Sequence, residues 1–175
     1  MIKKHLIRIV AVILAILVLL LASYALELVL LNHKAIPVLK NFYFGMNPLR
    51  AGTLLGRCYE IRRNVSDTGK ASFEYKAVIF GHDATVHCYF LPILCFQMTN
   101  VSFIWEDCDQ ELYDQIYSCI YEYYCDHENF SVETQYNSLR NIDEVQFSID
   151  NGATGLFFDL GMTEEKIYLR CTDLS

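Results

Sequence analysis

The chain lacks most of the motifs that identify a function from sequence. No two of its seven cysteines are spaced as Cys-x-x-Cys, so neither a thioredoxin-type site nor a zinc ribbon is indicated. The motifs Gly-x-Ser-x-Gly, Ser-x-x-Lys and His-Glu-x-x-His are absent, as are phosphate-binding glycine loops. Only three prolines are present and repeats are lacking, so the composition is that of a folded domain. The sequence predicts no cofactor.

Basic residues are scarce in the C-terminal part of the chain. Residues 77–175 carry three of them, Arg140, Lys166 and Arg170, against 17 acidic residues. Because phosphate contacts require a basic face, we expect no nucleic-acid binding there. Residues 34–76 are basic instead, with eight cationic and three acidic side chains. This part either contacts anionic lipid headgroups or forms an ordinary solvated surface.

One long hydrophobic run is present near the N-terminus. Ile9 to Leu26 is a stretch of 18 residues without a charge, and Leu28 to Leu31 continues it beyond Glu27. A helix of 18 residues is about 27 Å long, close to the thickness of the hydrocarbon layer. The sequence therefore predicts that residues 9–31 form a transmembrane helix in contact with membrane lipid.

The charges that flank this run predict its orientation. Lys3, Lys4 and Arg8 crowd the N-terminal side, which favours a cytoplasmic tail of residues 1–8 and a C-terminal domain outside the cell membrane. The alternative is a cleaved signal peptide, with Ser23 and Ala25 at the −3 and −1 positions, and a secreted product. The length of the run favours an uncleaved, single-pass signal-anchor.

The remaining residues, about 140 of them, match the size of one domain. We expect a juxtamembrane connector over 32–50, with Phe42, Tyr43 and Phe44 in an interfacial aromatic belt, and an extracytoplasmic domain over 51–175. Polar and apolar residues from Gln110 onward follow a helical period, with Asp107 or Asp109 as the N-cap. The predicted fold class is α+β, a mostly antiparallel sheet with this one amphipathic helix packed on it. Strands are expected within 49–63, 73–79, 86–91, 93–105, 145–149, 154–160 and 167–171.

One dense set of metal-capable side chains is present. His82, Asp83 and His87 would lie on a hairpin and its returning strand, where they could converge on one ion. The plainer interpretation is that His82 and Asp83 are turn residues and His87 is a surface residue of a strand. A complete site also needs a further ligand that the sequence does not place.

The seven cysteines all follow the hydrophobic run. In an oxidising compartment an odd number leaves one thiol free or paired between chains. Cys58, Cys88 and Cys171 fall on predicted strands, where buried inert thiols are the ordinary expectation, although one or more disulfides are equally compatible with the sequence.

Three functions remain open. The first, which we favour, is a non-catalytic extracytoplasmic domain that binds a partner protein or ligand. The second is a metal-dependent hydrolase that uses His82, Asp83 and His87. The third is a self-associating structural membrane protein, such as a homodimer linked through the unpaired cysteine.

Overall fold

The computed structural model describes residues 2–63, 71–91, 97–150, 152 and 154–174, with parts of the N-terminal helix and the last residues of the first strand described by backbone alone. The fold is α+β, as predicted. The helices are α1 (Ile2–His33), α2 (Pro48–Leu55) and α3 (Gln110–Tyr124). The strands are β1 (Cys58–Arg63), β2 (Ala71–Ile79), β3 (His82–Leu91), β4 (Gln97–Trp105), β5 (Phe130–Asn137), β6 (Ile142–Asp150), β7 (Gly155–Met162) and β8 (Ile167–Asp173).

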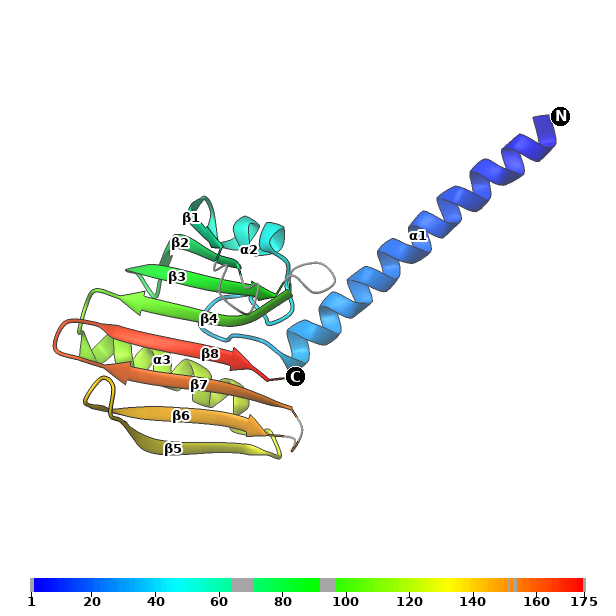
Figure 1. The fold of residues 1–175 in the computed structure, drawn as a ribbon. Coiled ribbons are helices and arrows are strands. Elements are labelled where there is room, and N and C mark those ends of the chain that lie inside the picture. The colour runs from blue at the N-terminus through cyan, green and yellow to red at the C-terminus, as the bar shows by residue number, and fades with distance from the viewer. Residues whose placement is uncertain (1, 64–70, 92–96, 151, 153, 175) are drawn as a thin grey trace.

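The eight strands form one sheet in which every neighbouring pair is antiparallel. Their order is β1-β2-β3-β4-β8-β7-β6-β5. The sheet therefore consists of two four-stranded meanders, β1–β4 and β5–β8, joined where β4 pairs with β8. Helix α3 connects the two meanders and crosses behind the sheet (Figure 1).

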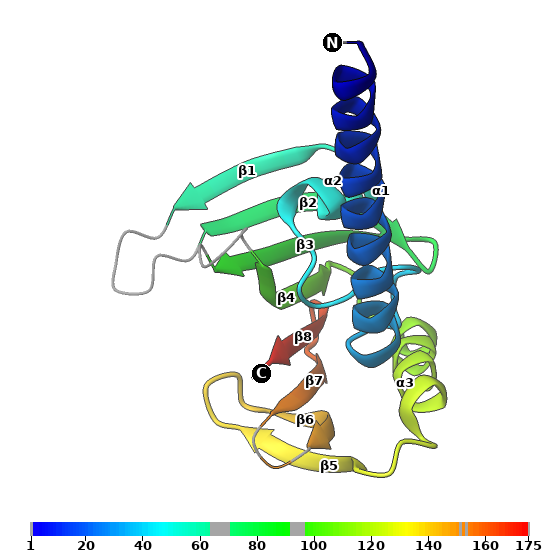
Figure 2. The ribbon, with the colours of Figure 1, turned by 90° about the vertical axis from the view of Figure 1, so that its right-hand side faces the viewer.

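The described helices of the folded body lie on one face of the sheet, and none of them lies on the opposite face (Figure 2). The hydrophobic core fills the space between the sheet and the helices. Its largest fully buried side chains include Trp105, Phe103, Phe147 and Phe158 from the strands and Leu112 from α3. Because side chains alternate along a strand, the other half of the strand residues lies on the face without helices, which we call the open face.

Helix α3 confirms the prediction for this segment. Asp109 is the N-cap and accepts a hydrogen bond from the Glu111 backbone N–H at 2.9 Å. Leu112, Ile116 and Ile120 are buried against the sheet. Tyr124 is buried with them, whereas the adjacent Tyr123 is 49% exposed.

The segment expected to be a juxtamembrane connector is partly built into the core. Phe42, Tyr43 and Phe44 are at most 4% exposed, so the prediction of an interfacial aromatic belt at these residues is wrong. Tyr124 donates its hydroxyl to the Ala35 carbonyl at 2.5 Å, and Cys119 donates its thiol to the Pro37 carbonyl at 3.3 Å. These contacts hold the segment under α3. The physical reason is that these aromatic side chains fill space in the core, where Phe42 packs against Phe103 of β4 and Phe44 against Phe158 of β7.

Two elements differ from the predicted pattern. Residues 48–55 form α2, where a strand was favoured, because Asn47 caps the helix through the Arg50 N–H at 2.9 Å and Pro48 occupies its first turn. Strand β5 was not predicted. Its side chains are mostly exposed, so it carries little of the apolar alternation that marks a half-buried strand.

Helix α1 projects away from the body, and its base lies beside the C-terminus (Figure 1). There the Lys34 Nζ lies 2.7 Å from an Asp173 carboxylate oxygen. The side chains described in α1 are those of residues 10–25 and 29. Searched over its described residues, the chain has no helix with the length and apolar character that crossing a membrane requires.

Candidate functional site

Strand β3 carries all three members of the predicted metal set. Asp83 and His87 lie on the open face, about 13 Å apart along the strand. His82 pairs with the buried Ile79 and lies on the helix side, where its Nδ1 is 3.0 Å from an Asp107 carboxylate oxygen. Among the residues that the structure describes, no three His, Cys, Asp or Glu side chains are grouped to hold a metal ion. The metal site stays a prediction without geometric support.

The six described cysteines are free thiols, and Cys95 lies outside the described residues. Cys88 and Cys171 are fully buried on the helix side of the sheet. Burial raises the pKa of both thiols well above the usual value, which keeps them protonated and unreactive. No intrachain disulfide joins any two of these six.

The open face is polar and is organised in rows of directly opposed residues. Two adjacent rows cross six strands, from β6 to β2. One row is Glu144, Gly161, Tyr168, Ile104, Thr85 and Lys76, and the other is Gln146, Asp159, Arg170, Ser102, His87 and Glu74. The rows bring acidic and basic side chains of the second meander side by side, so this part of the open face is where polar groups converge.

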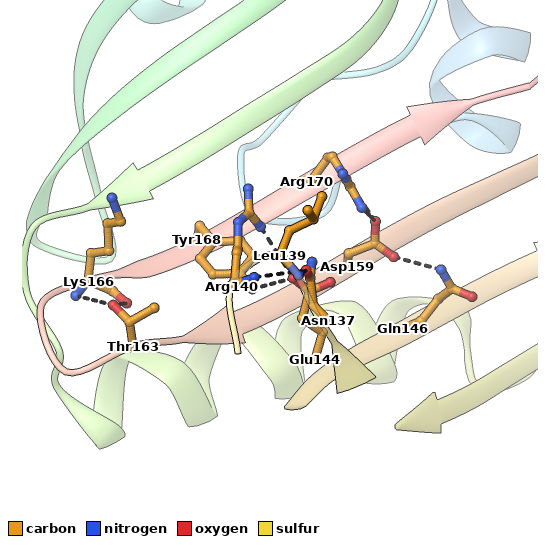
Figure 3. Close-up of polar contacts among 10 residues, drawn as sticks. All are labelled: Asn137, Leu139, Arg140, Glu144, Gln146, Asp159, Thr163, Lys166, Tyr168 and Arg170. Atoms are coloured by element: carbon orange, nitrogen blue, oxygen red, sulfur yellow. Dashed lines mark hydrogen bonds and ion pairs between the residues drawn. The ribbon is translucent and has the colours of Figure 1, made fainter. Parts of the chain in front are cut away.

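Glu144 and Asp159 are the charged side chains that are buried among the described residues, at 2% and 4% exposure. A buried carboxylate is costly unless it is paired and hydrogen-bonded. Both lie on the face that no helix covers, so other groups of the open face must bury them. We call the two carboxylates and their partners the carboxylate cluster, and Figure 3 shows its members.

Three donors converge on one oxygen of Glu144. The Tyr168 hydroxyl and the Asn137 side-chain amide donate hydrogen bonds to its Oε1, and Arg140 Nη1 lies 3.3 Å from the same atom (Figure 3). The Arg140 guanidinium also lies over the Tyr168 ring, 3.9 Å from its centre. Asn137 and Arg140 come from the end of β5 and the loop that follows it. The buried charge of Glu144 therefore holds this loop against the sheet.

Asp159 is paired in the neighbouring row. Arg170 donates two hydrogen bonds to its Oδ2, from Nε at 2.9 Å and from Nη2 at 2.7 Å. The Gln146 side-chain amide donates to the other oxygen at 2.7 Å. Both arginine donors meet one carboxylate oxygen, and hydrogen bonds between charged groups of this kind are stronger than those between neutral groups. It joins β6, β7 and β8 on the open face.

The loop between β5 and β6, residues 138–141, has a defined conformation. The Asn137 side-chain oxygen accepts hydrogen bonds from the backbone N–H groups of Leu139 and Arg140, at 3.1 and 3.2 Å. Asn141 has a positive φ of 59° and accepts the Tyr136 hydroxyl at 2.6 Å. With these contacts in place, the Leu139 side chain is 96% exposed and Tyr136 is 61% exposed.

This loop lies at the end of the sheet opposite the base of α1. Strand β8 ends at Asp173, which pairs with Lys34 at that base. Strand β5 runs opposite to β8, because three antiparallel pairings separate them. Its C-terminal end and the loop therefore lie at the far end of the sheet (Figure 1).

Tyr168 and Arg170 of the carboxylate cluster hold their protons near neutral pH. Burial raises the pKa of Tyr168 and the hydrogen bond to Glu144 raises it further, so the phenol keeps its proton near neutral pH. Burial alone would lower the pKa of Arg170, but the hydrogen bonds and charge of Asp159 raise it above its usual value. The cluster holds two carboxylates and two guanidinium groups, so its formal charges balance.

Two grooves lie outside the carboxylate cluster. One of about 430 Å³ is lined by Lys76 to Val78, Asp83 to Thr85 and Glu106. The other, of about 650 Å³, runs between Phe80 and the exposed face of α3 and is lined by acidic side chains such as Glu111, Asp114 and Glu122. In the first groove Lys76 Nζ donates a hydrogen bond to the Thr85 hydroxyl at 2.5 Å, and the second groove also contains Ser118 and Cys119.

The residues of the carboxylate cluster were not found from the sequence. Glu144 is an ordinary polar residue of an alternating strand, and its burial depends on a loop whose preceding strand was not predicted. The signal that could have located the loop is the pair Asn137 and Asn141, because asparagine favours turns and positive φ. No pattern in the sequence indicates that Leu139 would remain exposed.

Comparison with known proteins finds no matching family model, no similar curated protein and no similar solved structure.

Proposed function

We propose that this chain is a single-pass membrane protein whose extracytoplasmic body binds a protein partner without catalysis. In this proposal residues 9–31 of α1 cross the membrane as an uncleaved signal-anchor with the N-terminus in the cytoplasm. The loop 138–141 and the neighbouring Tyr136 are the contact site. The observation that carries the proposal is the almost complete exposure of Leu139 on a loop that buried ionic contacts hold in place.

The exposure of α1 supports the anchor. Every described side chain from Val10 to Ala25 is exposed, and the large apolar ones among them are 49–69% exposed. Each large aliphatic side chain gains about 1.5–3 kcal/mol when it leaves water. An isolated helix is also marginal in water even with good helix formers. A lipid environment satisfies both requirements for a helix that projects from its own body (Figures 1 and 2).

The preorganisation of the loop supports the binding role. Leu139 and Tyr136 are large side chains that are left in water, while Glu144 is buried to hold the backbone beneath them. Surface anchors of this kind bind better when their loop is already ordered, because less conformational entropy is lost on association. The loop lies far from the base of α1, so a partner outside the membrane can reach it.

The anchor is tested by alkaline carbonate extraction of membranes that contain the full chain, with intact mass measurement of the product. Retention in the membrane at full length is the expected result. Release by carbonate, or a mass that shows cleavage near Ala25, would contradict the anchor.

The contact site is tested by placing a photocrosslinking amino acid at Leu139 of the full chain in its native membranes. The matched control is the same substitution at Leu174, which is also exposed but lies at the other end of the sheet. We expect one adduct of defined mass from position 139 and none from position 174. The adduct should be lost when Glu144→Ala releases the loop. Equal labelling from both positions would contradict the assignment, and an adduct of twice the chain mass would identify the partner as a second copy.

A further inference from the structure

The exposed face of α2 differs in charge from the rest of the body. Ala51 and Leu55 point into the core. The opposite side of the helix and its C-terminal cap consist of exposed residues at helical spacing without an acidic side chain. They are Leu49, Arg50, Thr53, Gly56 and Arg57, which we call the α2 face. No acidic residue lies in the first turn of the helix either.

The two arginines of the α2 face have no ion-pair partner among the described residues, and the same holds for Lys40 and Lys166, whereas the remaining described cations of the body are paired. Arg140, Arg170 and Lys34 each pair with a carboxylate. Residues 77–175 carry 17 acidic side chains, and none of them pairs with the two arginines in the described part of the chain. Unpaired, exposed guanidinium groups are available to contact an anionic surface outside the protein.

Leu49 adds an apolar group to the same face. Its side chain is 83% exposed and directly precedes Arg50. An exposed aliphatic side chain beside cations is the combination found in segments that lie at a membrane interface, where the apolar group enters the headgroup region and the cations contact phosphate.

The position of α2 fits this combination. Helix α2 lies on the side of the body from which α1 projects (Figures 1 and 2). The connector between the two helices is held in the core through Phe42 and Phe44, so α2 stays near the base of α1. If α1 spans a bilayer, α2 is therefore among the elements nearest to its surface.

We infer that the α2 face docks on the anionic phospholipid headgroups of the membrane that holds α1. Arg50 and Arg57 contact lipid phosphates, and Leu49 enters the headgroup layer. The inference rests on the proposed anchor and adds a second, lipid-dependent contact that fixes the body against the bilayer surface.

The experiment uses the full chain in vesicles of phosphatidylcholine, with or without phosphatidylglycerol, and with brominated lipids as short-range fluorescence quenchers. Leu49→Trp introduces a reporter, and the only natural tryptophan, Trp105, is fully buried and serves as the background. We expect the new tryptophan to be quenched in vesicles that contain phosphatidylglycerol and less so in phosphatidylcholine alone.

Neutralising variants in the Leu49→Trp background test the role of charge. One basic residue near an anionic surface contributes about 1 kcal/mol, so Arg50→Gln or Arg57→Gln should each lower the ratio of docked to undocked protein about 5-fold. Lys166→Gln, which removes one charge at the far end of the sheet, should leave the ratio unchanged.

Absence of quenching in protein that resists carbonate extraction would overturn the docking of the α2 face and leave the anchor intact. Equal quenching in both lipids would overturn the recognition of anionic headgroups. Release of the chain by carbonate would overturn the anchor, and with it this inference.

Discussion

Gly161→Ala is the substitution whose effect follows most directly from the packing of the carboxylate cluster. Gly161 lies in β7 directly opposite Tyr168 and Glu144. A Cβ atom added at Gly161 would lie 3.0 Å from Cε1 of Tyr168 and closer still to its hydroxyl oxygen and Cζ. The tyrosine ring therefore occupies the space that any larger residue at position 161 needs. An alanine must push the ring away from Glu144.

The cost follows from the interactions that the displaced ring loses. A hydrogen bond to a charged acceptor contributes about 1.5–3 kcal/mol, and leaving Glu144 short of a donor adds to the loss. Keeping the ring in place instead compresses the site, which costs about 1–3 kcal/mol. With the weakened contact between Arg140 and the ring, we expect Gly161→Ala to destabilise the body by about 3–5 kcal/mol. That is a large part of the total stability of a domain of this size.

The assay is urea unfolding of the full chain in detergent micelles, followed by the fluorescence of Trp105, which is buried in the core and reports on the body. The control is the same substitution in a Tyr168→Ala background. Without the ring the added methyl group meets no obstacle, and alanine is about 0.5–1 kcal/mol better than glycine within a strand. The cost should therefore vanish or change sign. An equal cost in both backgrounds would refute the role assigned to the ring.

Three further outcomes are expected from the same unfolding assay. Leu139→Ser should leave stability within about 0.5 kcal/mol of the wild type, because its side chain is 96% exposed, whereas Asn137→Ala should cost about 1–3 kcal/mol by removing the loop contacts. A large effect of Leu139→Ser would show that the loop is packed. Asp109→Ala should cost about 1 kcal/mol through the lost N-cap, and Asp109→Asn should restore most of it. Stability should also fall at alkaline pH. Burial raises the pKa of Cys171, so its contribution is complete below the unfolded thiol pKa of about 8.5 and declines by about 1.4 kcal/mol per pH unit above it. Cys171→Ala should reduce this alkaline slope, and an unchanged slope would contradict the argument.

The elements that the sequence predicts well are those in which the buried residues recur at the regular spacing of a helix or a strand. In α3, Asp109 supplies the cap, and Leu112, Ile116 and Ile120 repeat at helical spacing, so the helix is evident from the residues alone. Strand β6 alternates around the buried Phe147 and Ile149, whereas β7 is identified by its run of apolar residues and is buried on both faces. Local sequence and tertiary packing agree at these positions.

The elements that the sequence does not predict depend on contacts between distant residues. Strand β5 is an edge strand with mostly exposed side chains, so its pairing with β6 leaves little trace in its hydrophobicity. Phe42 and Phe44 look like interfacial aromatics because they follow a hydrophobic helix. Only the packing of α3 and the strands over them places them in the core.

The carboxylate cluster illustrates the same limit at the level of a site. Glu144, Asp159 and Tyr168 are separated along the chain and become neighbours only through the order of β6, β7 and β8. The set His82, Asp83 and His87 is close in sequence, yet strand alternation divides it between two faces. Proximity along the chain is a poor guide to convergence in a sheet, because adjacent residues point to opposite sides.

The direction in which the candidate contact site faces follows from strand order alone. Lys34 and Asp173 tie the base of α1 to the end of β8, and the buried connector prevents the body from turning freely about that point. An odd number of antiparallel pairings between β8 and β5 then places the loop 138–141 at the opposite end of the sheet. One strand fewer in the second meander would bring such a loop beside α1. If α1 spans a membrane, the four-stranded meander is therefore what presents Leu139 away from the bilayer, while α2 remains on the side that faces it.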